Sequence, residues 1–248
     1  MSRKRSGQDF ASHVMGGEHL VDAPEIKTEG DELTIRQLGD FSRTSCRGGH
    51  DKLEIKLGHS GDYHPLASYG RYVIRVPAGA KVHIGGGVVA GSIGDVGELD
   101  VGQDSCGDLK VGEVAGKAEA AVNGSGDIVV GSIGGGLRAA VNGSGDIKVG
   151  AIKGDLHVGI NGSGDVVAAS LEGDIDAAIR GSGDVTVHGG HASAVKASIM
   201  GSGDVRFEGV AADVDLSAFG SGDVYVAQAT GTVKKASFGS GDVRIGKN

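Results

Sequence analysis

Residues 142–165 read NGSGDIKVGAIKGDLHVGINGSGD, which is one full period of a repeat together with the motif that opens the next. The Gly-Ser-Gly-Asp motif recurs at a nearly constant interval along the chain. Its aspartates are Asp127, Asp146, Asp165, Asp184, Asp204, Asp223 and Asp242. A degenerate copy, which ends at Asp108, lies one further interval upstream, and an earlier copy carries Gly87 in place of the aspartate. A fixed period of this length is typical of solenoids.

Each repeat contains two runs in which apolar residues alternate with variable ones. In the unit quoted, the first run is Ile147-Lys148-Val149 and the second is Leu156-His157-Val158-Gly159-Ile160. Alternation with a period of two predicts strands with one buried face. The glycines around each Ser and in the links between the runs predict tight turns.

Two arrangements of such strands satisfy this pattern, a meander of antiparallel hairpins and a coil in which equivalent strands stack in parallel. The first inward position after each aspartate is nearly uniform in shape: Ile128, Ile147, Val166, Val185, Val205, Val224 and Val243. Stacked coils place like residues on top of one another, whereas a meander requires no such uniformity. We therefore predict an all-β, parallel β-helix of about 19 residues per coil, with right-handed coils because parallel crossovers are almost always right-handed.

The repeat divides the chain into three parts. Residues 83–248 are expected to form regular coils, and residues 20–82, which alternate less regularly, to form irregular opening coils and a cap over the first core layer. Residues 1–19 are expected to be a mobile tail. No polar capping coil is visible after Val243-Arg244-Ile245, so we expect end-to-end or subunit contacts and a homo-oligomer.

Composition argues against several classes of partner. The chain has 248 residues, 48 of them Gly, and a net charge of −8. The only basic run is Arg3-Lys4-Arg5, and no basic stripe alternates with aromatic residues, so a nucleic-acid partner is not expected. No window approaches the ~18 apolar residues of a membrane span, and no apolar run of ~7–15 residues follows the basic one, so a signal peptide is not visible. Cys46 and Cys106 lie in unlike contexts and do not indicate a compartment.

The aspartates form the first candidate site, because in a coil they stack at one corner. These are Asp108, Asp127, Asp146, Asp165, Asp184, Asp204, Asp223 and Asp242. Stacked carboxylates repel one another unless hydrogen bonds or cations compensate. We interpret the ladder as structural, with each carboxylate accepting backbone N–H groups of its own turn and hydroxyls of the neighbouring serines. Calcium is the alternative, but this spacing differs from that of calcium-binding β-rolls, so no metal is expected.

Two further columns are candidate binding surfaces. The column before Gly-Ser-Gly reads Asn123, Asn142, Asn161, Arg180, Met200, Phe219 and Phe238. Its asparagines can hydrogen-bond along the column, and Phe219 and Phe238, joined by Tyr225, are candidates for sugar stacking or partner docking. The outward column of small residues contains Ala140, Gly159, Ala178 and Ser198, and it lets another surface approach closely. The alternative for both columns is plain packing. A neighbouring outward column is charged: Glu119, Arg138, His157, Asp176, Lys196, Asp215 and Lys234.

Metal binding and catalysis find little support in the pattern. His50, His59 and His64 lie in the irregular part, and His188 and His191 share a Gly-rich turn, but neither group has the spacing of a familiar zinc site. Catalysis needs an asymmetric group of residues, whereas the carboxylates here repeat uniformly. Arg180, the one cation in the asparagine column, is a weak catalytic candidate that we do not adopt. We therefore expect no catalytic residues and no cofactor.

The repeated Gly-Ser-Gly-Asp-Val units, preceded by Val76-Pro77-Ala78-Gly79-Ala80, resemble the family of putative bacterial adhesins with a GIN-type head domain and its related domains of unknown function. The resemblance covers residues 71–248, and more loosely the chain from about residue 20. It implies a two-sheet parallel β-helix without a recognised catalytic set. It also implies a role in adhesion at the cell envelope or outside the cell, although members are usually exported and no signal segment is visible here.

Two classes of function remain from the sequence. The first is a non-catalytic adhesion-like or structural module of the envelope, which presents a rigid repetitive surface to a polysaccharide, to a cell-surface partner or to itself. The second is a carbohydrate-active β-helix enzyme, a lyase or hydrolase, with an unrecognised site. Uniform ladders favour the first class, and a cluster of non-repeating polar residues in one groove would favour the second.

Overall fold

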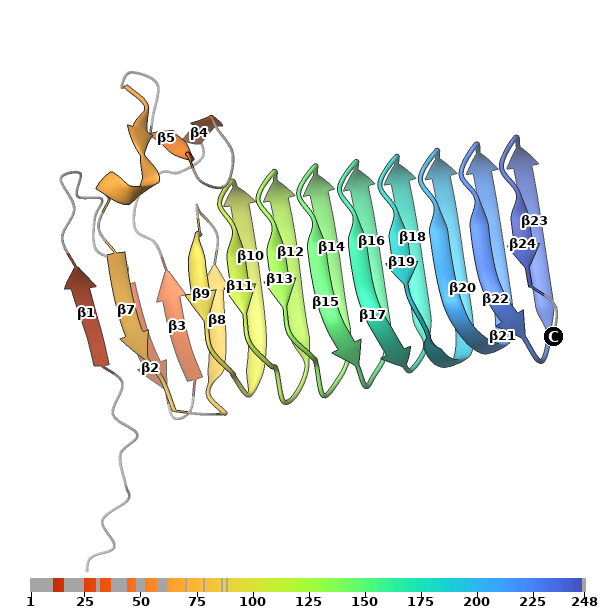
Figure 1. Ribbon diagram of the computed structural model, residues 1–248, viewed down its shortest axis with the longest axis horizontal. Helices are drawn as coiled ribbons and strands as arrows, with labels where there is room; N and C mark the ends of the chain where they lie inside the picture. Colours follow the sequence, from red (N-terminus) through yellow and green to blue (C-terminus); the bar gives the residue numbers. More distant parts are fainter. Residues whose placement is uncertain are drawn as a thin grey trace, which may run out of the picture.

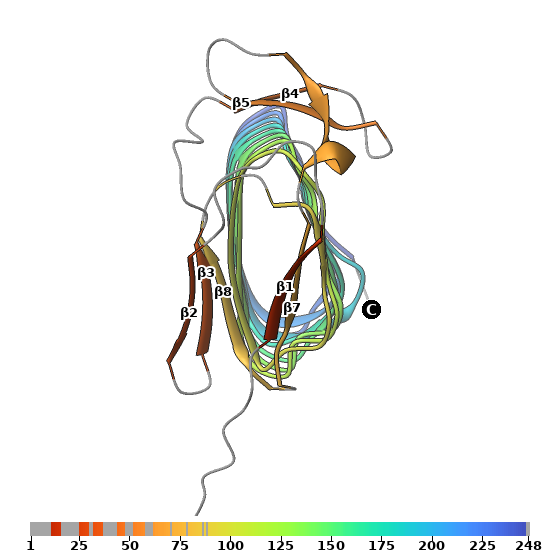
Figure 2. The same ribbon diagram turned by 90° about the vertical axis from the view of Figure 1, so that its left-hand side faces the viewer.

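The computed structural model describes residues 11–15, 25–29, 32–36, 44–47, 52–57, 62–69, 71–77, 79–85, 87 and 89–246. Within these ranges the chain is all-β, with one 3-10 turn, η1 (Leu66–Ser68), and no α-helix. The strands wind into a parallel β-solenoid of about nine turns with about 19 residues per coil, which confirms the predicted fold class. Viewed along its axis, the solenoid is a flattened oval with two long sides (Figure 2).

The two long sides are parallel sheets, here called face A and face B. Face A contains β8 (Lys81–Gly85), β10 (Glu98–Ser105), β12 (Ala118–Gly124), β14 (Leu137–Gly143), β16 (Leu156–Gly162), β18 (Ile175–Gly181), the second half of β20 (Gly190–Gly201), the second half of β21 (Val205–Gly220), and β23 (Val233–Gly239). Face B contains β9 (Gly91–Ile93), β11 (Leu109–Val111), β13 (Ile128–Val130), β15 (Ile147–Ile152), β17 (Val166–Glu172), β19 (Val185–Val187), the start of β21, β22 (Val224–Ala229) and β24 (Val243–Ile245). Figure 1 shows the regular repetition of these strands along the axis.

The core consists of inward residues that stack in register from coil to coil. Ile128 pairs with Ile147 and Ile147 with Val166, as the alternation predicts, and all three are 0–1% exposed. A third inward column lies in the link between the faces and was not predicted: Val96, Val114, Ile133 and Ile152. Burial of each such side chain stabilises the fold by roughly 1.5–3 kcal/mol, so every coil contributes a similar layer of core.

The N-terminal part extends face A of the solenoid. The hairpin of β2 (Glu25–Glu29) and β3 (Glu32–Arg36) continues face A, because β3 pairs in parallel with β8. A separate antiparallel pair joins β1 (Ala11–Met15) to β7 (Arg71–Arg75). Residues 11–15, which we expected in a mobile tail, therefore form a strand, and the rest of residues 1–19 lies outside the described residues.

A small antiparallel sheet is attached to the first coils by a disulfide. It consists of β4 (Thr44–Arg47), β5 (Glu54–Leu57) and β6 (His64–Pro65), and it lies above the first coils in Figure 1. Cys46 of β4 forms a disulfide with Cys106. Cys106 occupies the Ser position of the degenerate motif and is 4% exposed. The sequence did not predict this bond, because nothing in the spacing of the two cysteines places β4 over that corner.

Gln103 is the one buried polar residue among the described core positions. It points inward from β10, in register with Val122, and is fully buried. Its side-chain nitrogen donates a hydrogen bond to the carbonyl of Gly107, while its Oε1 has no hydrogen-bond partner within the described part of the chain. A buried carbonyl without a donor costs about 1–3 kcal/mol.

Replacing Gln103 with Val is expected to raise the free energy of unfolding by about 1 kcal/mol, because Val removes the unpaired carbonyl and continues the apolar column of Val122. Chemical denaturation of the purified variant measures the change. The matched control Val122→Gln places the same amide one coil later and should lower stability. A loss of stability in Gln103→Val would contradict this account.

The last described coil is more polar inside than we predicted. Lys235 and Ser237 lie in register with the buried residues Leu216 and Ala218, so they face the core layer beneath. The Lys235 ammonium donates to the carbonyl of Val243 at 3.4 Å, and the Ser237 hydroxyl donates to that of Gly241 at 2.9 Å. The polar inner residues thus lie in the last coil itself, before Val243-Arg244-Ile245, where the sequence analysis did not look for them. Inward-pointing charge is a known protection against edge-to-edge association, so the end of β23 gives little support to the expected end-to-end contact.

Candidate binding surface

The outer side of face A carries three columns that run parallel to the solenoid axis. Register pairs Ala121 with Ala140, Ala140 with Gly159 and so on through Ala178, Ser198, Ser217 and Ala236, so the small residues form one continuous column. The charged column that contains Glu119 and Arg138 lies on one side of it, and the column that contains Asn142 lies on the other. The sequence therefore identified which outward residues are neighbours on this face.

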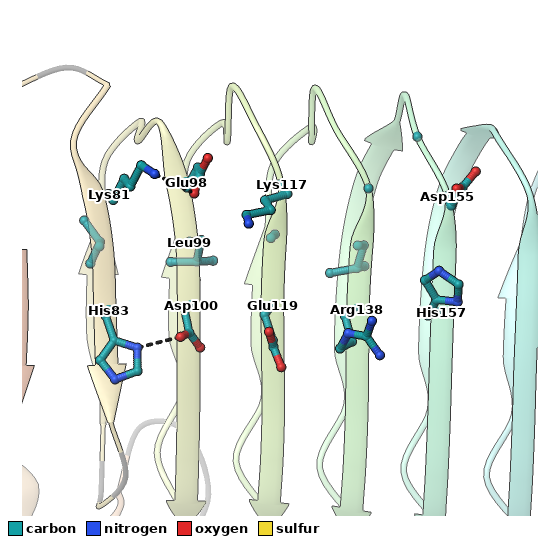
Figure 3. A pocket seen from close by; sticks show the side chains of 15 residues that line it. Lys81, His83, Glu98, Leu99, Asp100, Lys117, Glu119, Arg138, Asp155 and His157 are labelled. Atoms are coloured by element: carbon teal, nitrogen blue, oxygen red, sulfur yellow. Dashed lines mark hydrogen bonds and ion pairs between the residues drawn. The ribbon is translucent and has the colours of Figure 1, made fainter. Parts of the chain in front are cut away.

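A groove of about 730 Å³ crosses five successive strands at the N-terminal end of face A. Two rows of side chains line it (Figure 3). Row 1 consists of Lys81, Glu98, Lys117, Gly136 and Asp155, and row 2 consists of His83, Asp100, Glu119, Arg138 and His157. Glu119, Arg138 and His157 were named from the sequence as a charged column. Row 1 was missed because it precedes the alternating run, although most of its members also recur at the repeat interval.

An ion pair and a histidine–carboxylate hydrogen bond engage the charged side chains of the groove at β8 and β10. The Lys81 ammonium lies 3.3 Å from a carboxylate oxygen of Glu98. Nδ1 of His83 lies 2.6 Å from a carboxylate oxygen of Asp100, as the dashed line in Figure 3 marks. These pairs are solvent-exposed, so each contributes little to stability. Their main effect is that these four side chains already have partners within the protein.

The asparagine column is hydrogen-bonded from one coil to the next. The amide nitrogen of Asn142 donates to the amide oxygen of Asn123 at 2.8 Å, and Asn161 donates to Asn142 at 3.0 Å. The column begins one coil earlier than the sequence suggested, because Asn123 donates to the carboxylate of Asp104 at 2.8 Å. These bonds fix the edge of face A and hold neighbouring strands in register.

The same column ends in exposed apolar side chains. Met200, Phe219 and Phe238 are 55%, 48% and 64% exposed. The two phenylalanine rings stack with centroids 5.2 Å apart and an interplanar angle of 8°, so each covers one face of the other. A sugar ring that stacks on an aromatic residue needs a free face, which leaves the outer face of Phe238 as the available one.

Tyr225 does not join this aromatic patch. It points outward from face B, where the Arg206 guanidinium lies 4.7 Å from the centre of its ring. Of the binding residues proposed from the sequence, the structure brings Phe219 and Phe238 together. It also aligns Ala140, Gly159, Ala178 and Ser198 in one column beside them, and it places Tyr225 on the opposite sheet.

The aspartate ladder serves the backbone of the corner. Oδ1 of each aspartate accepts the backbone N–H of the aspartate one coil later, as in the bonds from Asp165 to Asp146 at 3.0 Å and from Asp184 to Asp165 at 2.8 Å. The donor thus lies in the next coil, whereas we expected it in the same turn. A second, unpredicted ladder follows the same rule at another corner, where Asp174 N–H donates to Asp155 at 2.9 Å.

The cost of burying a carboxylate of this ladder, and of stacking it on its neighbours, is visible at Asp184. Burial raises the pKa of its carboxyl group, the N–H of Asp204 opposes that rise, and the neighbouring charges of Asp165 and Asp204 add to it. A raised pKa means that the folded state binds the proton more tightly than the unfolded state. The charged form of Asp184 therefore costs stability at neutral pH, and this cost disappears as the pH falls through the raised pKa and then the ordinary one.

Asp184→Asn is expected to keep or raise stability at pH 7, because the amide oxygen still accepts the Asp204 N–H while the charge is removed. Asp184→Ala should fall below the Asn variant by about 1 kcal/mol, since that N–H loses its acceptor. Denaturation at pH 7 and near pH 3 checks both expectations. The advantage of Asn over Asp should shrink at the lower pH, and an advantage that grows there would contradict the sign of the pKa change.

The histidines do not converge on a common ligand. His188 lies 3.1 Å from Glu208, and His191 lies 3.2 Å from Glu172. His64 lies in β6, whereas His50 and His59 fall outside the described residues. Among the residues that the structure describes, no three His, Cys, Asp or Glu side chains are placed to hold a metal ion. Arg180 takes its outward position between Asn161 and Met200 and has no ion pair in the described ranges.

The fold, with its Gly-Ser-Gly-Asp corner, has a counterpart among known families. The sequence matches the family described as putative auto-transporter adhesin, head GIN domain, over residues 5–191 and again over residues 153–248. This chain belongs to that family. The resemblance drawn from the repeated motif is thereby confirmed, and membership in an adhesin head family agrees with an adhesion-like role. No curated protein and no solved structure matches the chain. In the parts of the chain that are described, no helix has the length and apolar character needed to cross a membrane.

Proposed function

We propose that this GIN-family protein is a non-catalytic adhesion module of the cell envelope that holds an extended polymer in the groove on face A. The observation that carries the proposal is the groove itself, which crosses five strands and is lined by two rows of polar side chains. A site that runs along the solenoid axis suits a ligand longer than a single sugar or amino acid. A polysaccharide is a polymer of this kind, so we take polysaccharides as the first ligand class.

Rigidity of the surface supports this role. The asparagine ladder and the two aspartate ladders tie each coil to the next through hydrogen bonds of 2.7–3.2 Å. A surface whose side chains and strands are already fixed loses little conformational entropy when a ligand binds. The small residues beside the groove, such as Ala140 and Gly159, also allow a flat partner to approach the sheet closely.

The disulfide supports a location outside the reducing cytosol. Bonds such as that between Cys46 and Cys106 form and persist in oxidising compartments, and they are rare in cytosolic proteins. Adhesion at the envelope requires such a location. The family description points in the same direction.

Co-sedimentation with a panel of polysaccharides and cell-wall fractions tests the proposal. Glu119→Trp fills the groove from row 2 and should weaken binding of any polymer by about tenfold or more, which corresponds to about 1.4 kcal/mol. Asp215→Trp, in the same outward column five coils later, is the matched control and should bind as the unmodified protein does. Equal binding by Glu119→Trp would show that the polymer lies elsewhere.

The groove also provides the specific observation that favours a second candidate, a carbohydrate-active enzyme. Glu98, Asp100 and Glu119 line it together with Lys and Arg side chains, and paired carboxylates are the groups that glycosidases use. Assay of each supernatant for released sugar separates the two functions. Binding without release supports the adhesion module, whereas release that Glu119→Trp abolishes would establish the enzyme.

A further inference from the structure

We infer that the centre of the groove binds the carboxylate or sulfate groups of an acidic polysaccharide, through Lys117 and Arg138. The inference rests on the proposed function and deepens it by naming the chemistry of the ligand. It depends on which charges in the groove are already engaged and which are free.

Most charged groups of the groove have partners within the protein. Lys81 pairs with Glu98 and His83 with Asp100 at the N-terminal end. At the other end, Asp155 accepts the backbone N–H of Asp174 through Oδ1. In Figure 3, the Asp155 carboxylate points toward the turn and away from row 2. Lys81 and His83 are therefore already engaged, and Asp155 directs its carboxylate away from the centre of the groove.

The free charges lie on β14 and at the start of β12, and cations outnumber carboxylates there. The side chains of Lys117 and Arg138 make no ion pair or hydrogen bond with any described residue, and Glu119 is the one carboxylate of this stretch whose side chain likewise has no such partner. Both cations are exposed to solvent. In Figure 3 the Glu119 carboxylate points along its own strand, away from Lys117 and from row 1. A polymer in the groove therefore meets two unpaired cations at its centre.

Gly136 leaves room for an anionic group at this point. It takes the row 1 position between Lys117 and Asp155, directly before β14 and two residues before Arg138. A Cβ on Gly136 would lie 2.9 Å from the carbonyl oxygen of Asp155, so a larger residue would crowd this position. The gap in row 1 gives a carboxylate or sulfate access to Arg138, whose planar guanidinium suits two-point contact with either group.

The rest of face A lacks such a cationic centre. Beyond the groove Lys196 lies in register between two carboxylates, Asp176 and Asp215. Arg138 has a carboxylate, Glu119, on one side only and His157 on the other. The protein as a whole carries a net charge of −8. The net negative charge of the protein would therefore repel an acidic polymer. Binding of such a polymer requires a local cationic site.

Three forms of one glucan test the inference: neutral dextran, carboxymethyl dextran and dextran sulfate. We expect the two charged forms to bind the full chain at least about tenfold more tightly than neutral dextran at low salt, with the difference shrinking as NaCl is added. Lys117→Gln combined with Arg138→Gln should remove most of that difference. Glu119→Gln should tighten binding of the charged forms by about two- to threefold, because it removes the one free carboxylate.

Lys196→Gln combined with Lys234→Gln is the matched control, since it removes the same charge from the same face outside the groove. If this control still binds the charged dextrans more tightly than neutral dextran, the inference is supported. If both double variants lose that preference equally, the binding is general charge attraction and the inference is overturned. Equal or absent binding of all three dextrans also overturns it. If the protein binds other polymers instead, and Glu119→Trp blocks that binding, the inference fails but the proposed function stands. The substitutions lie on exposed positions, and thermal melting confirms that each variant is folded.

Discussion

Gly164→Ala is expected to lower the free energy of unfolding by about 3 kcal/mol or more, whereas Gly159→Ala in the same coil should change it by less than about 1 kcal/mol. A Cβ on Gly164 would overlap the carbonyl oxygen of Gly145 in the preceding coil. That oxygen belongs to a stacked backbone and cannot move without separating two coils, so the strain is spread over several residues. At Gly159 a Cβ would meet no atom within 4 Å.

The same contact recurs at the second glycine of successive motifs, at Gly183, Gly203, Gly222 and Gly241. The first glycine of each motif has a further constraint, since Gly162 has a φ of +152° and lies against Gly143. Chemical denaturation of the two alanine variants measures the contrast. In a solenoid the damage should appear first in the coils that touch residue 164, which hydrogen exchange resolves. A Gly164→Ala protein as stable as Gly159→Ala would mean that the corner tolerates a wider separation of coils than the structure has.

Removal of the Cys46–Cys106 disulfide is expected to cost the N-terminal sheet roughly 4 kcal/mol, on the estimate for a loop of about 60 residues. Each coil contacts mainly its neighbours, so the loss should stay local. We expect β4, β5 and β6 to exchange amide hydrogens much faster, while β14 to β22 keep their protection.

The double variant Cys46→Ser and Cys106→Ser is the appropriate form, because Ser at position 106 restores the residue that the other motifs carry. Hydrogen exchange with and without a reductant on the unmodified protein gives an independent measurement of the same effect. Polymer binding in the groove is a useful second readout. The groove is lined from β8 to β16 rather than from the small sheet, so binding should survive reduction. Loss of protection across the whole solenoid would contradict a local role.

The repeat itself determined most of the fold. Two alternating runs in every repeat define which side chains point inward. The uniform Ile and Val after each Asp favour stacked coils over a meander, because stacking brings like positions together. The same periodicity placed the small, charged and asparagine columns on one face, as register confirms for Ala140 beside Gly159. It also contained a signal that was overlooked. Lys235 and Ser237 follow Leu216 and Ala218 at the repeat interval, which alone implies a polar inner layer in that coil.

Other features depended on tertiary structure for physical reasons. The Cys46–Cys106 bond requires the position of a small sheet whose sequence has no period, and no local pattern places it over the first corner. The backbone N–H that donates to each of these aspartates, at 2.7–3.2 Å, belongs to the neighbouring coil. Which N–H donates therefore follows from how the coils stack and not from the sequence of the turn. The groove is a similar case. Which of its charges are engaged depends on side-chain directions in five coils at once, and those directions leave Lys117 and Arg138 free while Lys81 and His83 are paired.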